Sequence, residues 1–217
     1  MTKYFMCVVA GLLLLASCTK DRISGSGTIT TEDRNISNFT KVSTSGSTDI
    51  HIVKGTNFSV QVKGYSNLLP YFETKLRNNT LEVGYRSGTN VQNDNLEVFV
   101  TMPTFEGANV SGSANIDVKG AFASNRIDAS ISGSGNIDIE SGTAQMFDAD
   151  VSGSGNIRAF GLTADRADIS LSGSGTAELK VVTHLKAAIS GSGSIYYKGT
   201  PAIESSVSGS GRLVHRP

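Results

Sequence analysis

Apolar and polar residues alternate along much of the second half of this chain, and the alternation keeps one phase from segment to segment. Residues 127–131 read Ile-Asp-Ala-Ser-Ile, and residues 147–151 and 167–171 repeat the pattern as Phe-Asp-Ala-Asp-Val and Ala-Asp-Ile-Ser-Leu. A period of two is typical of a β-strand with one buried face. The pattern therefore predicts a series of similar strands, most of them with Ala at the centre of the inward face.

A six-residue segment follows each of these strands and returns about every 20 residues, a period typical of stacked repeats. It reads Ser-Gly-Ser-Gly-Asn-Ile at 132–137 and again at 152–157. Related hexads begin at Ser111, Ser172, Ser190 and Ser208, and two outlying copies begin at Ser24 and Ser45. Because Gly adopts positive φ without steric cost and Asn tolerates it, we expect each hexad to be a turn.

A second alternating strand follows each hexad, and a second turn then closes the repeating unit. Ile137 and Ile139 form the inward face of one such strand, with Asp138 between them. Closing turns are expected at Gly120, Gly142, Gly161 and Gly199, and inward apolar residues are expected after them at Phe122, Ala144, Leu162 and Val182. Two strands and two turns leave no room for a helix in so short a unit. The sequence therefore predicts an all-β fold, a parallel right-handed β-solenoid whose strands stack about 4.8 Å apart.

Residues 36–106 repeat less regularly than residues 107–217, which hold the solenoid repeats. Strands in the less regular part are expected at residues 41–43, 49–53, 58–62, 74–77, 80–85 and 96–102, with a tight turn at Asn78-Asn79. An uncovered solenoid end would leave a strand edge without a partner. We therefore expect residues 36–106 to form a β-rich part that is continuous with the solenoid and covers its first coil.

The first 17 residues have the features of a secretory signal. Lys3 supplies a positive charge, residues 5–15 are apolar but too few to span a bilayer, and Leu15-Ala16-Ser17-Cys18 ends the segment. This ending resembles a bacterial lipoprotein signal, which implies that Cys18 is acylated. We therefore predict a signal peptide over residues 1–17, a lipid-anchored tether over residues 18–35 and an outer-membrane location with display on the cell surface.

Cysteine content and charge narrow the possible functions. Cys7 lies inside the signal, so Cys18 is the one cysteine expected in the mature chain, and no disulfide can form within it. Lys and Arg total 19, and Asp and Glu also total 19. This balance gives no electrostatic reason to expect nucleic acid as a partner.

Motifs that would indicate catalysis or cofactor binding are not found. No hexad completes a GxGxxG motif, no Ser lies in GxSxG, and His51, His184 and His215 are far apart in the sequence. We therefore expect no catalytic residue and no cofactor.

One acidic column deserves a separate hypothesis, because Asp128, Asp148 and Asp168 occupy the same place in successive repeats. Three stacked carboxylates are candidate Ca²⁺ ligands, or candidate catalytic acids of a β-helix enzyme that acts on carbohydrate. Arg126 and Arg166 precede two of these residues by two positions, on the same strand face. We favour the interpretation that the arginines neutralise the column as a surface charge ladder.

The last hexad ends at Leu213, close to Pro217. We expect the final strands to leave backbone groups without partners, which makes this C-terminal edge a candidate contact surface for a homo-oligomer. Arg212, His215, Arg216 and Pro217 are expected to restrict which strands can add to it.

Four features of the sequence together resemble those of a known protein family. They are Phe-Thr-Lys-Val at 39–42, Asp-Ile-His-Ile at 49–52, Leu-Glu-Val-Phe-Val-Thr-Met-Pro at 96–103 and the Gly-Asn-Ile repeats. Together they resemble the head GIN-domain family of auto-transporter adhesins over residues 36–215, which implies a binding or structural role. The hypothesis is a non-catalytic lipoprotein of the cell surface with a protein or glycan ligand. A carbohydrate-active enzyme that uses the acidic column, and an envelope scaffold that faces the periplasm, are the alternatives.

Overall fold

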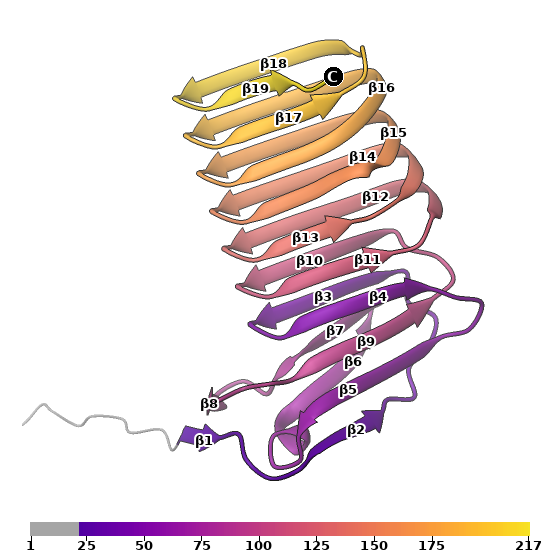
Figure 1. Ribbon diagram of the computed structural model, residues 1–217, viewed down its shortest axis with the longest axis vertical. Helices are drawn as coiled ribbons and strands as arrows, with labels where there is room; N and C mark the ends of the chain where they lie inside the picture. Colours follow the sequence, from indigo (N-terminus) through magenta and orange to yellow (C-terminus); the bar gives the residue numbers. More distant parts are fainter. Residues whose placement is uncertain (1–21) are drawn as a thin grey trace, which may run out of the picture.

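The computed structural model describes residues 22–217, which are nearly all β, with 70% strand and 2% helix (Figure 1). Its N-terminal part contains β1 (Arg22–Ser24), β2 (Ile29–Asp33), β3 (Lys41–Gly46), β4 (Asp49–Lys54), β5 (Ser59–Tyr65), the 3₁₀ turn η1 (Leu69–Tyr71), β6 (Phe72–Arg77), β7 (Thr80–Tyr85), β8 (Asn90–Gln92) and β9 (Glu97–Met102). The repeats contain β10 (Gly107–Gly112), β11 (Asn115–Lys119), β12 (Phe122–Gly133), β13 (Asn136–Ile139), β14 (Gly142–Gly153), β15 (Asn156–Gly173), β16 (Thr176–Gly191), β17 (Ser194–Lys198), β18 (Ala202–Gly209) and β19 (Arg212–His215). Across residues 22–217, no helix has the length and apolar character that crossing a bilayer requires.

The repeats stack as two facing parallel ladders, so the predicted β-solenoid is confirmed, with about five turns. One ladder consists of β7, β3, β10, β12, β14, β15, β16 and β18, each paired in parallel with the next. The other consists of β9, β4, β11, β13, β15, β16, β17 and β19. The hexad turns lie one above another along one edge of the molecule (Figure 1).

The space between the ladders is filled by the inward columns that the alternation predicts. The residue before each hexad is buried at Val110, Ile131, Val151, Leu171 and Ile189, and the column of small residues is buried at Ala108, Ala129, Ala149 and Ala187. Residues 22–217 contain no cysteine. Apolar burial and the ladder hydrogen bonds therefore hold one coil on the next.

The hexads are turns, but their Asn residues are not the ones with positive φ. The first Gly of the hexad adopts positive φ, for example 136° at Gly133 and 126° at Gly153. A Cβ on Gly133 would lie 2.3 Å from the carbonyl oxygen of Gly112 in the coil below. Asn136 instead begins a strand, so Gly alone supplies the positive φ of these turns. The predicted turn at Asn78-Asn79 is confirmed, with φ values of 47° and 62°.

Two details of the closing turns also differ from our predictions. Gly161 lies inside the continuous strand β15, where a Cβ would be 1.7 Å from the carbonyl oxygen of Glu140. This glycine therefore allows close approach of two coils and makes no turn. Val181, and not Val182, points into the core, because the β15–β16 pairing changes register between Ala159 and Thr163.

The N-terminal part covers one end of the solenoid, as expected, but it does so with antiparallel strands. β5 pairs antiparallel with β9 and with β2, and β6 pairs antiparallel with β7. β1 and β2 fall within the predicted tether of residues 18–35, but β1 pairs with β8 and β2 pairs with β5, so these two strands belong to the fold. The hexad that begins at Ser45 is a coil of the ladder, whereas the one that begins at Ser24 joins β1 to β2 and stacks on no other hexad.

Candidate functional site

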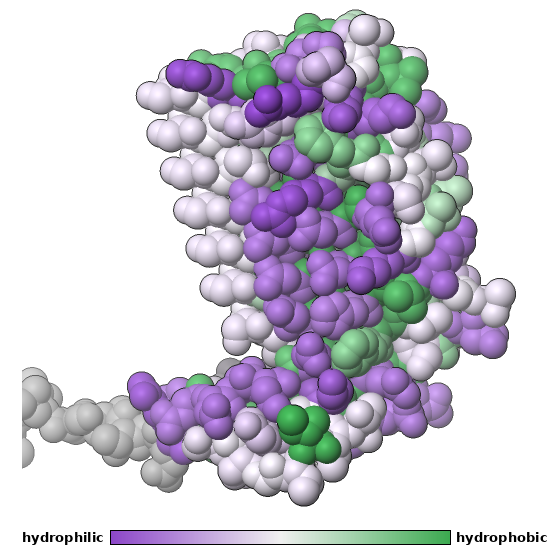
Figure 2. Space-filling model, in the orientation of Figure 1, coloured by the Kyte–Doolittle hydropathy of each residue, from purple (hydrophilic) through white to green (hydrophobic). Residues whose placement is uncertain are grey.

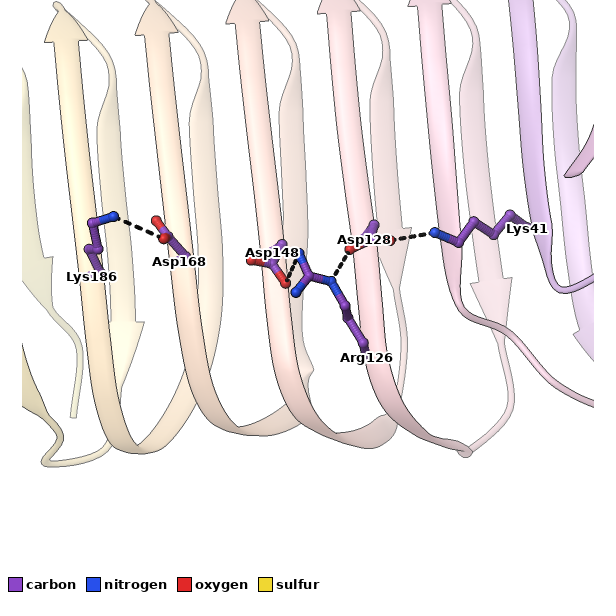
Figure 3. A network of polar contacts seen from close by, with 6 residues as sticks. All are labelled: Lys41, Arg126, Asp128, Asp148, Asp168 and Lys186. Carbon is purple, nitrogen blue, oxygen red and sulfur yellow. Dashed lines mark hydrogen bonds and ion pairs between the residues drawn. The ribbon is translucent and has the colours of Figure 1, made fainter. Parts of the chain in front are cut away.

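The acidic column forms on the outer face of one ladder, where parallel pairing places Asp128, Asp148 and Asp168 beside one another. Figure 3 shows Arg126 between Asp128 and Asp148, with Lys41 beside Asp128 and Lys186 beside Asp168 at the two ends of the row. Nε of Arg126 lies 2.7 Å from Asp128, and a second guanidinium nitrogen lies 3.0 Å from Asp148. The sequence therefore located the cluster correctly, together with the arginine that bridges its first two members.

Lysines supply the remaining cations of the column. Nζ of Lys41, on β3, donates to Asp128, and Nζ of Lys186, on β16, lies 3.2 Å from Asp168. Arg166 forms no ion pair within residues 22–217, so its predicted role in the column is wrong. Asp168 instead contacts Lys186, its register partner in the next coil.

The two bridged carboxylates differ in their titration. Partial burial raises the pKa of Asp148, with contributions from the neighbouring aspartates, although Arg126 opposes the shift. Burial would also raise the pKa of Asp128, but hydrogen bonds from Lys41 and Arg126 lower it below its ordinary value. Asp148 has the ion-pair distance to Arg126 without hydrogen-bond geometry, which leaves its Oδ2 buried without a hydrogen bond. The column is thus an ion-pair network with one poorly satisfied member.

No group of three His, Cys, Asp or Glu side chains within residues 22–217 has the arrangement of a metal site. Cys18, the predicted acylation site, lies outside the described residues. The three histidines have different neighbours: His51 lies between Glu97 and Asp117 and stacks on Phe99, His215 packs on Tyr197, and His184 is in register with Arg166 and Ala202.

A second polar ladder follows the hexads and was not predicted as a unit. Asn136 donates to Asn115 at 2.7 Å, Asn156 donates to Asn136 at 2.8 Å, and the Thr176 hydroxyl donates to Asn156 at 2.7 Å. Asp49 accepts from Asn115 at the other end of the ladder. The signal was the return of Asn at one hexad position. Its function is structural, since each side-chain amide donates a hydrogen bond to the side-chain oxygen in the neighbouring coil.

Two adjoining hollows form an open trough along the third side of the solenoid, where the chain crosses between the ladders. The larger has a volume of about 510 Å³ and is lined by Thr104, Glu106, Ala123, Ser124, Asn125, Thr143, Ala144, Gln145, Thr163 and Asp165. The second, of about 490 Å³, shares Asn125, Gln145 and Asp165 with it and adds Arg126, Met146 and Arg166. The shared side chains are amides and a carboxylate from three successive coils. Sequence reasoning missed this trough because its residues lie between the two alternating segments of each repeat.

The trough contains two carboxylates, but their separation is unsuited to paired acid–base chemistry on a glycosidic bond. Glu106 precedes β10 and Asp165 lies in β15, three coils further along the ladder, or roughly 14 Å at the strand spacing of a sheet. Glycosidases hold their two carboxyl groups about 5 to 9.5 Å apart. Glu106 also accepts a hydrogen bond from the Thr40 hydroxyl at 2.7 Å. The geometry favours hydrogen bonding to a ligand over hydrolysis of one.

Comparison with known proteins identifies a matching family and solved structures of similar fold. The sequence profile of the family described as "Putative auto-transporter adhesin, head GIN domain" matches residues 38–201. A solved structure of a "putative adhesin" from Bacteroides fragilis has a TM-score of 0.73 at 23% identity, over 89% of this chain and 100% of that one. A second "putative adhesin", from Parabacteroides merdae, has a TM-score of 0.57 at 23% identity over 91% and 100% of the two chains. The search of curated proteins gave no match.

A further solved structure carries a different description. It is called a "putative lipid binding protein", comes from Parabacteroides distasonis, and has a TM-score of 0.58 at 23% identity over 90% of this chain and 100% of that one. At this level of identity, the structural neighbours show the fold alone.

Proposed function

This chain belongs to the head GIN-domain family of auto-transporter adhesins, and we propose that it is a non-catalytic lipoprotein of the cell envelope that binds an extended ligand at the bacterial surface. The trough carries the proposal. It presents hydrogen-bonding side chains from successive coils in a row, at the regular spacing of a β-ladder. A rigid row of amides, hydroxyls and a carboxylate suits the repeated hydroxyl groups of a glycan chain, so we take a glycan as the ligand class.

The trough can be tested by blocking it. The chain from residue 19 onward contains every described strand and is suitable for binding to an array of neutral and acidic polysaccharides. Thr143→Arg places a long side chain in the larger hollow, and we expect at least tenfold weaker binding, about 1.4 kcal/mol. Ser152→Arg is the matched control, because Ser152 is also exposed on the same strand but lies in the hexad turn. Equal loss in both variants, or binding to immobilised proteins alone, would contradict the glycan trough.

The membrane anchor is a separate part of the proposal and rests on Leu15-Ala16-Ser17-Cys18. Two or more acyl chains on Cys18 would give stable membrane attachment, whereas one chain gives only marginal binding. We expect Cys18→Ala to move the protein from the membrane fraction to the soluble fraction. Unchanged partitioning of the variant would show that the anchor lies elsewhere.

Display at the surface is distinct from anchoring and needs its own measurement. Adhesin names among the relatives support an outward-facing chain. Proteinase K added to intact cells should remove the folded domain while a periplasmic control protein stays whole. Protection until the outer membrane is permeabilised would favour the alternative of a periplasmic scaffold.

The proposal of a non-catalytic protein is supported by the cations that occupy the acidic column. Arg126, Lys41 and Lys186 contact the carboxylates that a metal or a substrate would need. We therefore expect no micromolar Ca²⁺ binding in titration calorimetry. A Ca²⁺ site, or turnover of a polysaccharide, that Asp148→Asn abolishes would overturn this assignment and favour the enzyme.

A further inference from the structure

The last coil exposes the interior columns that the coil before it buries. Ile203 and Val207 are 44% and 46% exposed, whereas their register partners Leu185 and Ile189 are 0% and 3% exposed. Every residue of β18 is exposed. Figure 2 shows hydrophobic surface at this end of the molecule, the upper end in that view.

Both strands of this coil also have an unpaired edge. Within residues 22–217, β18 pairs only with β16 and β19 pairs only with β17. The outer N–H and C=O groups of both strands can therefore accept another strand. An exposed apolar cross-section beside two unpaired edges is a surface for strand addition.

We propose that two copies of this chain join through these ends, with β18 of each copy paired antiparallel with β19 of the other. Ser210 lies midway between Val207 and Leu213, the inward residues on either side of the last turn, so residues at equal distances before and after it occupy corresponding places on the two strands. A twofold axis parallel to the strands then places Val207 opposite Leu213 of the second copy. Both side chains belong to inward columns, so the pairing closes the open core.

The same register matches the charges on the outer faces. Glu204 lies opposite Arg216 of the second copy, and Ser208 lies opposite Arg212 of the second copy. Within residues 22–217, neither Glu204 nor Arg216 has an ion-pair partner, and the Arg216 guanidinium lies 4.7 Å from the centre of the Tyr196 ring. No like charges face each other in this arrangement, and opposite charges directly across a strand pair stabilise it. Charge complementarity therefore selects a second copy as the occupant.

The interface is isologous: each copy buries the same surface, so a dimer leaves no free surface of this kind and does not extend into a filament. The covered ends, where β1 lies, point away from each other in such a dimer (Figure 1). With the proposed anchor, the dimer would connect two membranes. The dimer itself does not depend on that anchor, since its test uses the chain from residue 19 onward, which lacks Cys18.

Cysteine pairs test the register directly. Ser206 and Val214 are equidistant from Ser210 and outward-facing, so they lie opposite each other in the dimer. A mixture of Ser206→Cys and Val214→Cys proteins should form a disulfide-linked heterodimer under mild oxidation, whereas neither variant should cross-link with itself. Ala188→Cys mixed with Tyr196→Cys is the control, because these residues are the register partners of Ser206 and Val214 one coil inward, and the mixture should give no product. Failure of the first mixture, or equal cross-linking of the single variants, would overturn the proposed pairing.

Sedimentation equilibrium on the same chain measures the association itself. We expect a dimer with a dissociation constant of about 10 μM or tighter, weakened about tenfold by Glu204→Arg or by Arg216→Glu. The double charge exchange should restore it, and Lys180→Glu, two coils inward, should leave it unchanged. Val207→Asp should give a monomer with unaltered circular dichroism, because Val207 is exposed in the single copy. A monomer at all concentrations, or single-variant losses that the double exchange does not restore, would overturn the proposal.

Discussion

The two ends of this solenoid are built from different kinds of sequence. At one end, antiparallel strands of the less regular part cover the stack, and the segment from Leu68 through η1 to the start of β6 buries Leu68, Leu69 and Phe72. At the other end, the repeat simply continues to β18 and β19, where Ile203 and Val207 stay exposed. Repetition can therefore extend a solenoid but cannot close it, because each coil buries its core only against neighbours.

The comparison implies that a residue's contribution to the free energy of unfolding depends on the coil that contains it, even where the repeat is the same. An inner coil has a coil on each side, the first coil has the covering strands on one side, and the last coil has one neighbour. In a stack stabilised by nearest-neighbour contacts, the same substitution should then cost different amounts in different coils. Matched substitutions at equivalent positions measure this difference.

The largest effect should come from the hexad glycines. Gly153 and Gly46 both have positive φ, but a Cβ on Gly153 would lie 2.3 Å from the Gly133 carbonyl oxygen, while a Cβ on Gly46 meets nothing within 4 Å. We expect Gly46→Ala to cost about 1–2 kcal/mol for the backbone conformation alone. Gly153→Ala adds a backbone clash and should cost about 2–5 kcal/mol. Urea denaturation of both variants checks the difference, and equal costs would mean that the coils can separate to admit a methyl group.

Core truncation should give an effect of similar size in a buried coil. Leu185 and Ile203 are register partners in neighbouring coils, yet only Leu185 is buried. Leu185→Ala should cost about 2–5 kcal/mol, as for other buried Leu side chains. Ile203→Ala should cost less than about 1 kcal/mol in the monomer. Equal losses at low protein concentration would show that Ile203 is buried in solution, and the comparison of the two ends would then fail.

The fold and the interior were predictable because their signal is local and repeated. Alternation identifies the inward columns wherever two coils follow the same register, as from Ala129 to Ala149. It fails where the register changes, and our misplacement of the core residue at Val182 marks that point. It also cannot report burial, because the apolar column continues through Ile203 and Val207 whether or not a neighbour covers them.

The acidic column shows what a single sequence leaves out of a site. Asp128, Asp148 and Asp168 were found because they share one position in the repeat. Lys41 was missed because it contacts Asp128 across 87 residues, from a strand whose repeat is degraded. The trough was missed for a related reason, since its residues have no alternating pattern and become neighbours only through stacking.

The asparagine ladder should give a smaller effect than the core. Asn136 both donates to Asn115 and accepts from Asn156. Asn136→Ala removes both bonds and leaves two half-buried partners unsatisfied, at a cost of about 1–2 kcal/mol. Ser194→Ala is the control, because the Ser194 side chain forms no hydrogen bond within the described residues and lies at the same hexad position nearer the open end. Thermal melts that rank the two variants equally would show that the ladder contributes nothing to stability.

The smallest effect should come from the acidic column, where two neighbouring carboxylates should respond to substitution in opposite directions. Burial would raise the pKa of Asp128, but hydrogen bonds from Lys41 and Arg126 outweigh it and lower the pKa from 3.8. The charged form of Asp128 therefore stabilises the fold at any pH above the pKa of the unfolded chain. This stabilisation is lost as the pH falls through the lower pKa of the folded protein. The pKa of Asp148 is raised from 3.8, chiefly by burial, so its charge is unfavourable at neutral pH, and the penalty disappears when both states are protonated. Asp128→Asn should therefore lower the melting temperature at pH 7, and Asp148→Asn should raise it. Each change in the free energy of unfolding should be less than about 1 kcal/mol, because water reaches both groups.

Melts at pH 7 and at pH 3 separate this electrostatic effect from packing. Both differences should shrink at the lower pH, since the neutral side chains then resemble Asn. Asp150→Asn, on the same strand but outside the column, removes the same charge and should change stability little at either pH. A loss of stability in Asp148→Asn at pH 7 would show that its ion pair with Arg126 outweighs its burial. The column would then be stabilised along its whole length, from the covered end toward the open one.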